Sequence, residues 1–454
     1  MNNFNEYLSL KNNCLFMEGV DVTEIAKEFS TPLFVFSENH IRNNLKRFKK
    51  CFEDHWPHGG VRILPSLKAC PLIAVRKILT DEGCGCDVFG PGELECALNA
   101  GVEPSEISVN GSIKDRALIK RTIEVGARLV IDSLQELQIC NEESNNLKKS
   151  IDILLRIKPF MDELELTSDF APDYSISELT QIIKYGIPKS ELLSMKSLIL
   201  DSDYINLVGV HAHMGRHSKD LKVWYSWVSS CIRLVYELSH LMNGWKPDII
   251  NFGGGFASDS DSDTDLIIKK YKGPSLDETA QTICNTISNT LDDLDFPLDN
   301  LQIEFEPGRA IHTDTGIHLT EVKNIKREAH NSNRNWIEVD TSEVFLNIHG
   351  VVEEDPFEFL VANKTNEKPS MKADIVGLTC NAEMLFIDHI LPEMEVGDII
   401  AILNTGSYIE PMTTNFNSLP RPGSVLVSGD QVNIIKRHET IDDVFSRDIV
   451  PEIT

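Results

Sequence analysis

Five short apolar runs between residues 62 and 157 decide the fold: RILPSLKA (62–69), GCDVF (85–89), ISVNG (107–111), LVIDS (129–133) and IDILLRI (151–157). They start 22 or 23 residues apart, and each is followed by a helical stretch. Three more runs follow at wider spacing: NLVGVHAHMG (206–215), DIINFGGG (248–255) and QIEFEPG (302–308). Strands that alternate with helices predict βαβ units and a parallel sheet. Eight such units close most naturally into a (β/α)8 TIM barrel, because a closed sheet has no edge strand.

Two segments of the chain show the helical period clearly. In residues 37–52, Ile41, Leu45, Phe48 and Phe52 fall at steps of four, three and four, which places them on one face. Another segment, at 275–294, opens with Ser275 and Glu278 at the spacing of a capping box. Its buried stripe is expected to contain Leu276, Ala280, Ile283, Ile287, Leu291 and Leu294.

The two ends of the chain have a different pattern. TPLFVF (31–36) predicts a strand ahead of the barrel. After about residue 310 the sequence predicts short strands and turns, as in VGDIIAILN (396–404), SVLVSGD (424–430) and QVNIIKR (431–437). We therefore expect residues 1–35 to join residues 310–454 in one β-domain of sandwich or barrel type, with the (β/α)8 barrel at 36–309.

The composition limits the possible partners. The chain has 454 residues, and 70 acidic against 43 basic side chains give a formal net charge of −27. Such an acidic surface repels nucleic acid and anionic membranes. No apolar run approaches the roughly 20 residues that span a bilayer. The N-terminus lacks the basic start and apolar stretch of a signal peptide, so we expect a cytoplasmic protein.

The sequence contains no pattern of a metal site. Its ten cysteines form no CxxC pair, and in a chain without a secretion signal most are expected to be reduced and buried. The acidic run SDSDSDTD (258–265) lacks the glycine and glutamate of a calcium loop. We interpret it as a solvated acidic loop.

The last two barrel runs end in residues suited to an anion. In a (β/α)8 barrel the active site lies where the strands end, and the loops after strands seven and eight commonly bind phosphate. Here these runs end in Gly253-Gly254-Gly255 and in Glu306-Pro307-Gly308-Arg309. Glycines bring backbone N–H groups close to an anion, although a lone glycine run also makes tight turns. With Arg309 in the adjoining loop, the pattern indicates a cofactor that carries a single phosphate.

Three side chains at the strand ends each have two interpretations. Lys68 is either a lysine that snorkels from a strand end or a desolvated amine that forms an imine; beside a phosphate site we favour the imine. Glu306 either pairs with Arg309 or, if the cofactor is pyridoxal phosphate, keeps the pyridine nitrogen protonated. His213 is either a satisfied core histidine or a ring that stacks on a flat cofactor.

These motifs resemble one family along nearly the whole chain. The sequence is similar to the fold-type III, pyridoxal-phosphate-dependent decarboxylases, which have an alanine racemase-like barrel, and within them to the diaminopimelate branch of the diaminopimelate and ornithine decarboxylase group. The matching motifs are EGVDVTEIAKEFSTPLFVF (18–36), LPSLKA (64–69), HAHMG (211–215), NFGGGF (251–256), EPGR (306–309), CNAE (380–383), TGSY (405–408) and NFNSLPRP (415–422).

The resemblance implies a role for each matching residue. Lys68 would bind pyridoxal phosphate as an imine, and Cys380 would return a proton to Cα after carbon dioxide leaves. The implied cofactor contacts are Arg156, His213, Gly254, Gly255, Glu306, Gly308, Arg309 and Tyr408. In this family the partner subunit completes the site with the residues matching Cys380 and Tyr408, so the resemblance predicts a homodimer with shared active sites.

Four departures from the diaminopimelate branch bear on the substrate. Arg216 stands where the family usually has serine, Asn381 where the branch has an acidic residue, and Leu419 where it often has arginine. The stretch TSEVFLNIHG (341–350) lacks the arginine and tyrosine that clamp the distal carboxylate in that branch. Without these partners, the distal carboxylate and amine of diaminopimelate would be buried in this site without charged groups to pair with. The substrate contacts that we expect are Arg216, Arg309, Asn381 and Tyr408.

The leading interpretation is therefore an amino-acid α-decarboxylase whose substrate has a distal group different from that of free meso-diaminopimelate, such as a conjugated or carrier-linked amino acid of a specialised pathway. The alternative is a diaminopimelate decarboxylase that makes L-lysine. A racemase on the same barrel is disfavoured by Glu306, because related racemases place an arginine at the pyridine nitrogen. A catalytically silent regulatory homologue is disfavoured because Lys68, Glu306, Arg309 and Cys380 are all present.

Overall fold

The structure is a computed structural model of the chain. It describes residues 7–161, 167–168, 171–215, 220–258, 273–328, 334–348 and 357–452. The chain divides into two compact units. The barrel unit contains the described residues between 44 and 311, and the β-unit contains those at 7–43 and 312–452.

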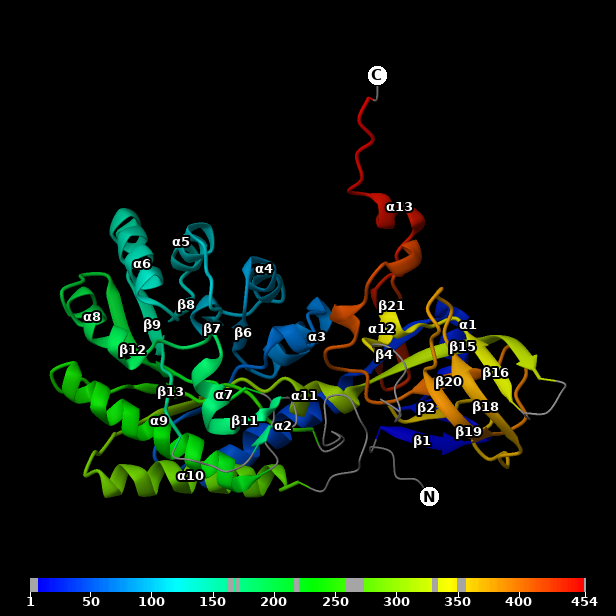
Figure 1. Cartoon of the computed structure of the whole chain (residues 1–454), viewed down its shortest axis with the longest axis horizontal. Coiled ribbons are helices and arrows are strands. Elements are labelled where there is room, and N and C mark those ends of the chain that lie inside the picture. Colours follow the sequence, from blue (N-terminus) through cyan, green and yellow to red (C-terminus); the bar gives the residue numbers. More distant parts are fainter. Residues whose placement is uncertain are drawn as a thin grey trace. The chain divides into compact units, whose positions relative to one another are not determined.

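The barrel unit is built on one eight-stranded sheet, whose strands pair only in parallel. The strand order is β5-β14-β13-β12-β9-β8-β7-β6. Figure 1 labels β6 to β9, β12 and β13 among these strands. The bounds are β5 Val61–Ile63, β6 Cys86–Val88, β7 Ile107–Val109, β8 Arg128–Ile131, β9 Ile151–Arg156, β12 Ile205–His211, β13 Ile249–Asn251 and β14 Gln302–Phe305. Each of the eight apolar runs in the sequence overlaps one of these strands, although β5, β8 and β12 begin one residue before their run.

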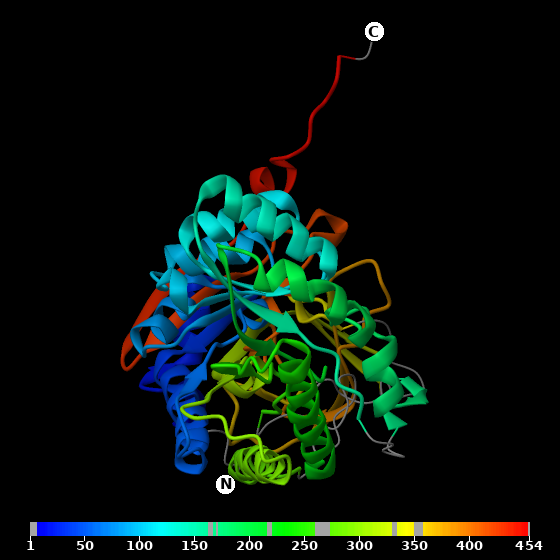
Figure 2. The same cartoon turned by 90° about the vertical axis from the view of Figure 1, so that its left-hand side faces the viewer.

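A parallel bridge between Ser66 and Asp87 brings the first and last strands of this order together, so the sheet nearly closes. Helices follow the strands along the chain and surround them (Figure 2). Their bounds are α2 Glu38–His55, α3 Ile73–Asp81, α4 Pro91–Asn99, α5 Arg116–Val125, α6 Leu134–Leu147, α7 Ile176–Ile182, α8 Lys189–Leu200, α9 Leu221–Leu241, α10 Leu276–Asp293 and α11 Arg309–His312. A short hairpin, β10 Thr167–Ser168 and β11 Ala171–Ser175, precedes α7. The predicted (β/α)8 barrel is thus confirmed.

Burial explains why these segments fold as they do. Strands β6, β7 and β8 are buried at every residue, as parallel strands covered on both faces should be. All four predicted apolar residues of α2 are buried. Helix α10 has the predicted capping box between Ser275 and Glu278. The middle of its predicted stripe is buried, whereas Leu276 and Leu294, at its ends, are half-buried.

The β-unit contains a nine-stranded sheet to which both ends of the chain contribute. Its main path is β19-β18-β16-β15-β4-β21-β22, and β20 pairs with β15 and β17. The bounds are β4 Leu33–Ser37, β15 Gly316–Arg327, β16 Asn335–Val339, β17 Phe359–Val361, β18 Met371–Val376, β19 Phe386–Leu391, β20 Ile399–Ile402, β21 Gly423–Ser428 and β22 Gln431–Lys436. A small sheet of β1 Leu8–Lys11, β2 Cys14–Met17 and β3 Val20–Asp21 precedes α1 Val22–Phe29. Two short helices, α12 Glu343–Leu346 and α13 Ile441–Phe445, complete the unit.

Strand β4 ties the N-terminal segment into this unit. It pairs antiparallel with β15 and parallel with β21, so it lies between two strands from the other end of the chain. One apolar cluster contains Leu15 and Val35 from the N-terminal segment together with Leu319, Ala401 and Val427. The prediction that the N-terminal strand belongs to the C-terminal sheet domain is therefore confirmed.

Some sequence features can be placed only in part. Residues 259–265 of the predicted acidic loop lie outside the described residues. In the part of the chain that the structure describes, no helix is long and apolar enough to cross a membrane. The same residues contain no group of three or more His, Cys, Asp or Glu side chains placed to hold a metal ion. The cytoplasmic location stays a prediction.

Candidate active site at the ends of the barrel strands

The predicted site residues of the barrel unit that the structure describes lie at the carboxyl ends of its strands. Arg156 is the last residue of β9, and His213 follows β12 by two residues. Gly253 to Gly255 follow β13, and Glu306 comes directly after β14. Lys68 lies in a single turn of 3-10 helix, Leu67–Ala69, after β5. Because the strands are parallel, these residues meet on one face of the barrel.

Glu306 is a buried carboxylate surrounded by neutral donors. It accepts hydrogen bonds from Asn110 Nδ2 at 3.0 Å and Asn251 Nδ2 at 2.9 Å, and His211 Nε2 lies 3.1 Å away. Burial raises the pKa of Glu306, against the opposing effect of the Lys68 cation. Burial also holds the pKa of His211 well below its ordinary value, so this ring is neutral and can donate to Glu306 through Nε2.

Glu304, two residues earlier on β14, has the opposite environment. Arg128 forms a two-point ion pair with it, and Arg62 Nη1 lies 3.3 Å from its Oε1. Burial alone would raise the pKa of Glu304, but these guanidinium groups lower it overall. The interior thus holds one carboxylate ionised by arginines and a second, Glu306, with neutral donors. That second carboxylate is suited to share a proton with a ring nitrogen.

The Lys68 amine lies beside a third buried carboxylate, that of Asp87. Its Nζ is 3.6 Å from Asp87 Oδ2, and its side chain is 40% exposed. Asp87 also accepts from Ser66 Oγ at 2.5 Å and from Asn110 Nδ2 at 2.6 Å. Burial, followed by the nearby Glu306 charge, raises the pKa of Asp87, while Lys68 opposes this. Asn110 therefore links the carboxylate beside the lysine to Glu306.

The glycine turn after β13 is packed too tightly for any side chain. Gly253 has a φ of +68° and Gly255 a φ of +97°, both in the left-handed region that favours glycine. A Cβ on Gly254 would lie 2.5 Å from the carbonyl oxygen of Glu306 and 3.3 Å from His213 Nε2. Phe252 and Phe256, which flank the turn, are both buried and anchor it. The turn is therefore held against the end of β14.

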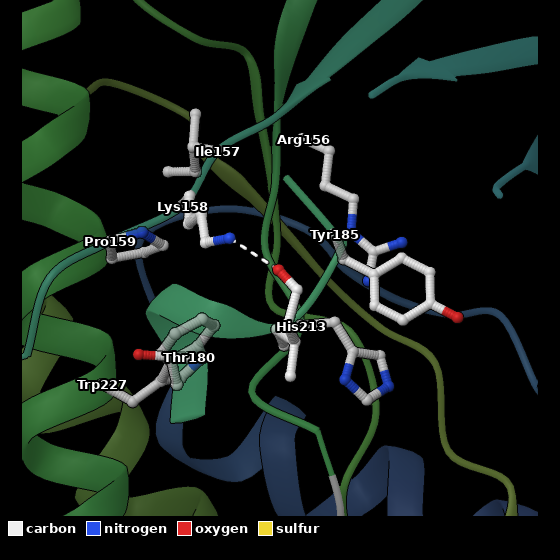
Figure 3. Close-up of a pocket in the computed structure, with 9 residues that line it drawn as sticks. Arg156, Ile157, Lys158, Pro159, Thr180, Tyr185, His213 and Trp227 are labelled. Carbon is white, nitrogen blue, oxygen red and sulfur yellow. Dashed lines mark hydrogen bonds between the residues drawn. The ribbon is translucent and has the colours of Figure 1, made fainter. Parts of the chain in front are cut away.

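His213 and Arg156 line a small pocket with Tyr185 and Trp227 (Figure 3). The Arg156 guanidinium lies over the Tyr185 ring, 4.3 Å from its centroid, and its Nε is 3.9 Å from Asp132 Oδ1. Burial, then the Lys68 cation, holds the pKa of His213 well below its ordinary value. A neutral imidazole is the form that can stack on another aromatic ring without an added charge.

The other predicted residues lie in the β-unit or outside the described part. Cys380 is the one exposed cysteine of the ten, none of which is paired in a disulfide. Tyr408 is half-buried and has a φ of +59°. Asn381 donates from Nδ2 to Glu343 Oε1 at 2.6 Å, and Glu343 is buried. Arg216 lies outside the described residues.

Comparison with known proteins decides which family has this arrangement. The model of the pyridoxal-binding domain of pyridoxal-dependent decarboxylases matches residues 38–313. The chain belongs to this family. The decarboxylase uses pyridoxal phosphate and is a carboxy-lyase that acts on an amino acid.

Relatives of the decarboxylase match it from end to end. It is 29% identical over 448 residues to the diaminopimelate decarboxylase of Archaeoglobus fulgidus, with 98% of this chain and 99% of the relative covered. It is 28% identical over 455 residues to the diaminopimelate decarboxylase of Methanocaldococcus jannaschii, with 98% of each chain covered. A crystal structure of the M. jannaschii enzyme matches with a TM-score of 0.86 at 26% identity, over 99% of both chains. The resemblance to the diaminopimelate branch is confirmed.

The barrel residues of the decarboxylase fit its cofactor. Glu306 provides a buried carboxylate for a ring nitrogen, Lys68 provides a partly exposed amine, and the glycine turn packs against Glu306 and His213 with no room for a Cβ. The individual roles of Lys68, Glu306 and His213 stay predictions. So do the phosphate contacts of Gly254, Gly255, Gly308 and Arg309, the last of which begins helix α11.

The sequence did not reveal the residues that surround Glu306 and Lys68. His211, Asn110, Asn251 and Asp87 hold Glu306 and Lys68 in place but were not predicted. A signal was present for two of them. His211 is two residues before His213, so strand periodicity places both on one face, and Asp87 is a lone charge inside an apolar strand. The amides have no such signal, because asparagine is equally common in turns.

Proposed function

We propose that this decarboxylase converts meso-diaminopimelate to L-lysine and carbon dioxide. The observation that carries the proposal is the end-to-end match to diaminopimelate decarboxylases, which covers both units of the chain. A crystal structure of the M. jannaschii enzyme in complex with L-lysine also matches, with a TM-score of 0.84. The sequence alone favoured a different distal group, with diaminopimelate as the alternative. The comparisons support that alternative better.

The chain's own side chains have separate tasks in this proposal. When bound, pyridoxal phosphate supplies the sink for the electron pair released as the Cα–carboxylate bond breaks. Lys68 binds the cofactor covalently, Glu306 keeps its ring nitrogen protonated, and His213 stacks on its ring. Arg156 orients polar groups near the ring. Gly254, Gly255, Gly308, Arg309 and the partner's Tyr408 bind the phosphate.

Proton return completes the reaction. Cys380 of the partner subunit donates its thiol proton to Cα, so that the S–H bond breaks, the C–H bond forms and the negative charge passes to sulfur. Cys380 is exposed on a loop, as a group that must reach a second subunit should be. Leu378 and Phe416, each 41% exposed, leave apolar surface beside this loop and its Asn417 neighbour. Such apolar surface supports the proposed homodimer.

The contact between Asn381 and Glu343 supports recognition of a distal amine. Asn381 replaces the acidic residue of the diaminopimelate branch, but its amide lies 2.6 Å from a buried carboxylate of α12. Negative charge is therefore still present next to the residue that follows Cys380. Arg309, Tyr408 and Arg216 are the further substrate contacts in this proposal.

One observation favours a second candidate, an α-decarboxylase for an amino acid with a different distal group. The stretch 341–350 has neither arginine nor tyrosine, and Leu419 replaces another arginine. A distal carboxylate would therefore lack partners from these positions. A conjugated or carrier-linked amino acid, whose distal end carries no free carboxylate, would not need them.

A substrate panel separates the two candidates. Purified enzyme is incubated with meso-diaminopimelate, lysine, ornithine and arginine, and carbon dioxide release is recorded together with the visible spectrum. We expect turnover of diaminopimelate with kcat/KM at least about 100-fold above that for the other amino acids. A cofactor chromophore that is bleached by borohydride, with no turnover of any free amino acid, would instead support the conjugated substrate.

Mixed subunits test the shared site. Lys68→Ala and Cys380→Ala proteins are each inactive in the proposal, but a hybrid dimer contains one intact site. Random exchange should restore about a quarter of the wild-type activity. No recovery, under conditions in which tagged subunits are shown to exchange, would contradict sharing.

A further inference from the structure

The side-chain amide of Asn417 makes two hydrogen bonds with Cys380, one as acceptor and one as donor. The backbone N–H of Cys380 donates to Asn417 Oδ1 at 2.9 Å. Asn417 Nδ2 lies 3.4 Å from Cys380 Sγ. The backbone donor can only face the amide oxygen, so the NH2 group must face the sulfur. The two residues are 37 positions apart in the sequence, and their contact is set by the tertiary fold.

The backbone at this contact is held in an unusual conformation. Asn417 has a φ of +55° and a ψ of +21°, and Ser418 follows with a φ of +57°. Left-handed backbone is unfavourable for residues other than glycine, although asparagine tolerates it better than most. Backbone of this kind persists only where the surrounding structure enforces it, and it is often found at functional sites.

The flanks of the turn are fixed by charged groups. Asn415 Nδ2 donates to Leu419 O at 2.9 Å and to Glu439 Oε2 at 2.6 Å. Arg421 binds the same carboxylate through its backbone N–H at 2.9 Å and its Nε at 2.7 Å. The Arg421 hydrogen bond lowers the pKa of Glu439 to about 2, so this carboxylate stays ionised at neutral pH. These hydrogen bonds fix the residues on both sides of Asn417 and so hold its amide beside Cys380.

We propose that Asn417 is the positioning residue for the Cys380 thiol. Its amide oxygen fixes the backbone of the cysteine, and its amide N–H group stabilises the thiolate that remains once the proton has moved to Cα. The step itself is unchanged: the S–H bond breaks, the C–H bond forms, and the charge left on sulfur receives a hydrogen bond. This inference rests on the proposed role of Cys380 as proton donor.

Two substitutions separate the two hydrogen bonds. Asn417→Gly removes both while the left-handed backbone stays allowed. Asn417→Asp keeps an acceptor for the Cys380 N–H but places a carboxylate oxygen against the sulfur. Asn300→Gly is the matched control, because Asn300 is an exposed asparagine with a φ of +55° in the barrel unit.

The first readout does not depend on activity. The rate of Cys380 alkylation by iodoacetamide is followed by peptide mass spectrometry from pH 6 to 10, with Cys380→Ser as the blank. We expect Asn417→Gly to slow alkylation about 3- to 10-fold at neutral pH and to move the profile to higher pH, because the thiolate loses a hydrogen bond. Asn417→Asp should move it further, because of charge repulsion, and Asn300→Gly should leave it unchanged.

The second readout is the division between kcat and KM. Each Asn417 variant should lower kcat by a factor similar to the factor by which it slows alkylation. KM and cofactor absorbance should stay close to wild type. Alkylation profiles of Asn417→Gly and Asn417→Asp that both overlay the wild-type profile would overturn the inference. If Cys380→Ala keeps full kcat, the proposed proton donor fails, whereas the alkylation profiles still report on the Asn417–Cys380 contact.

Discussion

The carboxyl ends of the barrel strands, here called the barrel mouth, and the loop that carries Cys380 place their site residues in different environments. In the barrel unit, Asp87 lies within β6 and Glu306 directly follows β14, and both are buried with several hydrogen-bond partners. In the β-unit, Cys380 is exposed on a loop and is held by one asparagine. Groups that set the state of a cofactor need a rigid, dry environment, because their pKa depends on burial and close neighbours. A group that delivers one proton needs access to its target.

The largest effects should separate these two regions by what is lost. Lys68→Ala should lower kcat by about 10³-fold or more and also abolish the borohydride-sensitive chromophore, because the covalent attachment is gone. Cys380→Ala should lower kcat by about 10²-fold or more but keep the chromophore and the cofactor affinity. Steady-state kinetics and visible spectra measure both. Exposed Lys77→Ala is the control for Lys68. An unchanged kcat in Cys380→Ala would contradict the proposal that Lys68 binds the cofactor while Cys380 returns the proton.

The next effect tests how tightly the barrel mouth is packed. Gly254→Ala places a Cβ 2.5 Å from the Glu306 carbonyl, so the turn must move. We expect a loss of about 1–3 kcal/mol in the free energy of unfolding and about a 10-fold weaker cofactor affinity. Gly92→Ala is the matched control, since a Cβ there meets nothing within 4 Å. Urea unfolding and cofactor titration give the two values. If both variants had the same free energy of unfolding and the same cofactor affinity, the glycine turn would be able to accept a Cβ in spite of its close contacts.

The smallest effect concerns the pH dependence of stability in the cofactor-free enzyme. The pKa of Glu306 is raised on folding, so its contribution is present below the unfolded value and lost as pH rises through the folded one. Between pH 4.5 and pH 8, the wild-type enzyme should therefore lose more stability, or gain less, than Glu306→Gln. Urea unfolding at several pH values measures the difference.

A second carboxylate provides the opposite sign for comparison. The pKa of Glu439 is lowered to about 2 by Arg421, so its contribution is present above the unfolded value and lost as the solution is acidified. Glu439→Gln should thus weaken the loss of stability on acidification. If both variants changed the profile in the same direction, the contrast between the two regions would not hold.

The sequence predicted the barrel better than it predicted the site. Each strand could be placed because a parallel strand is a short apolar run, and the runs recur between helices. Lys68, Gly254 and Glu306 could be proposed because strand ends converge in a barrel. Asn110 and Asn417 could not, because an asparagine in a turn has the same local signature whether or not its amide binds a distant group. The substrate also stayed open, because the sequence does not show contacts between distant residues, such as the hydrogen bond of Asn381 with Glu343.

By itself, the sequence determined the alternation of strands and helices, the position of the glycine turn and the membership of both chain ends in one β-unit. Periodicity and composition are local properties, and they decide which segments are buried. Only the tertiary structure decided that Asn110 joins Asp87 to Glu306, that His211 is a neutral donor, and that Asn417 faces Cys380. These contacts join residues 23 to 196 positions apart, and they form only when the folded chain brings those positions together.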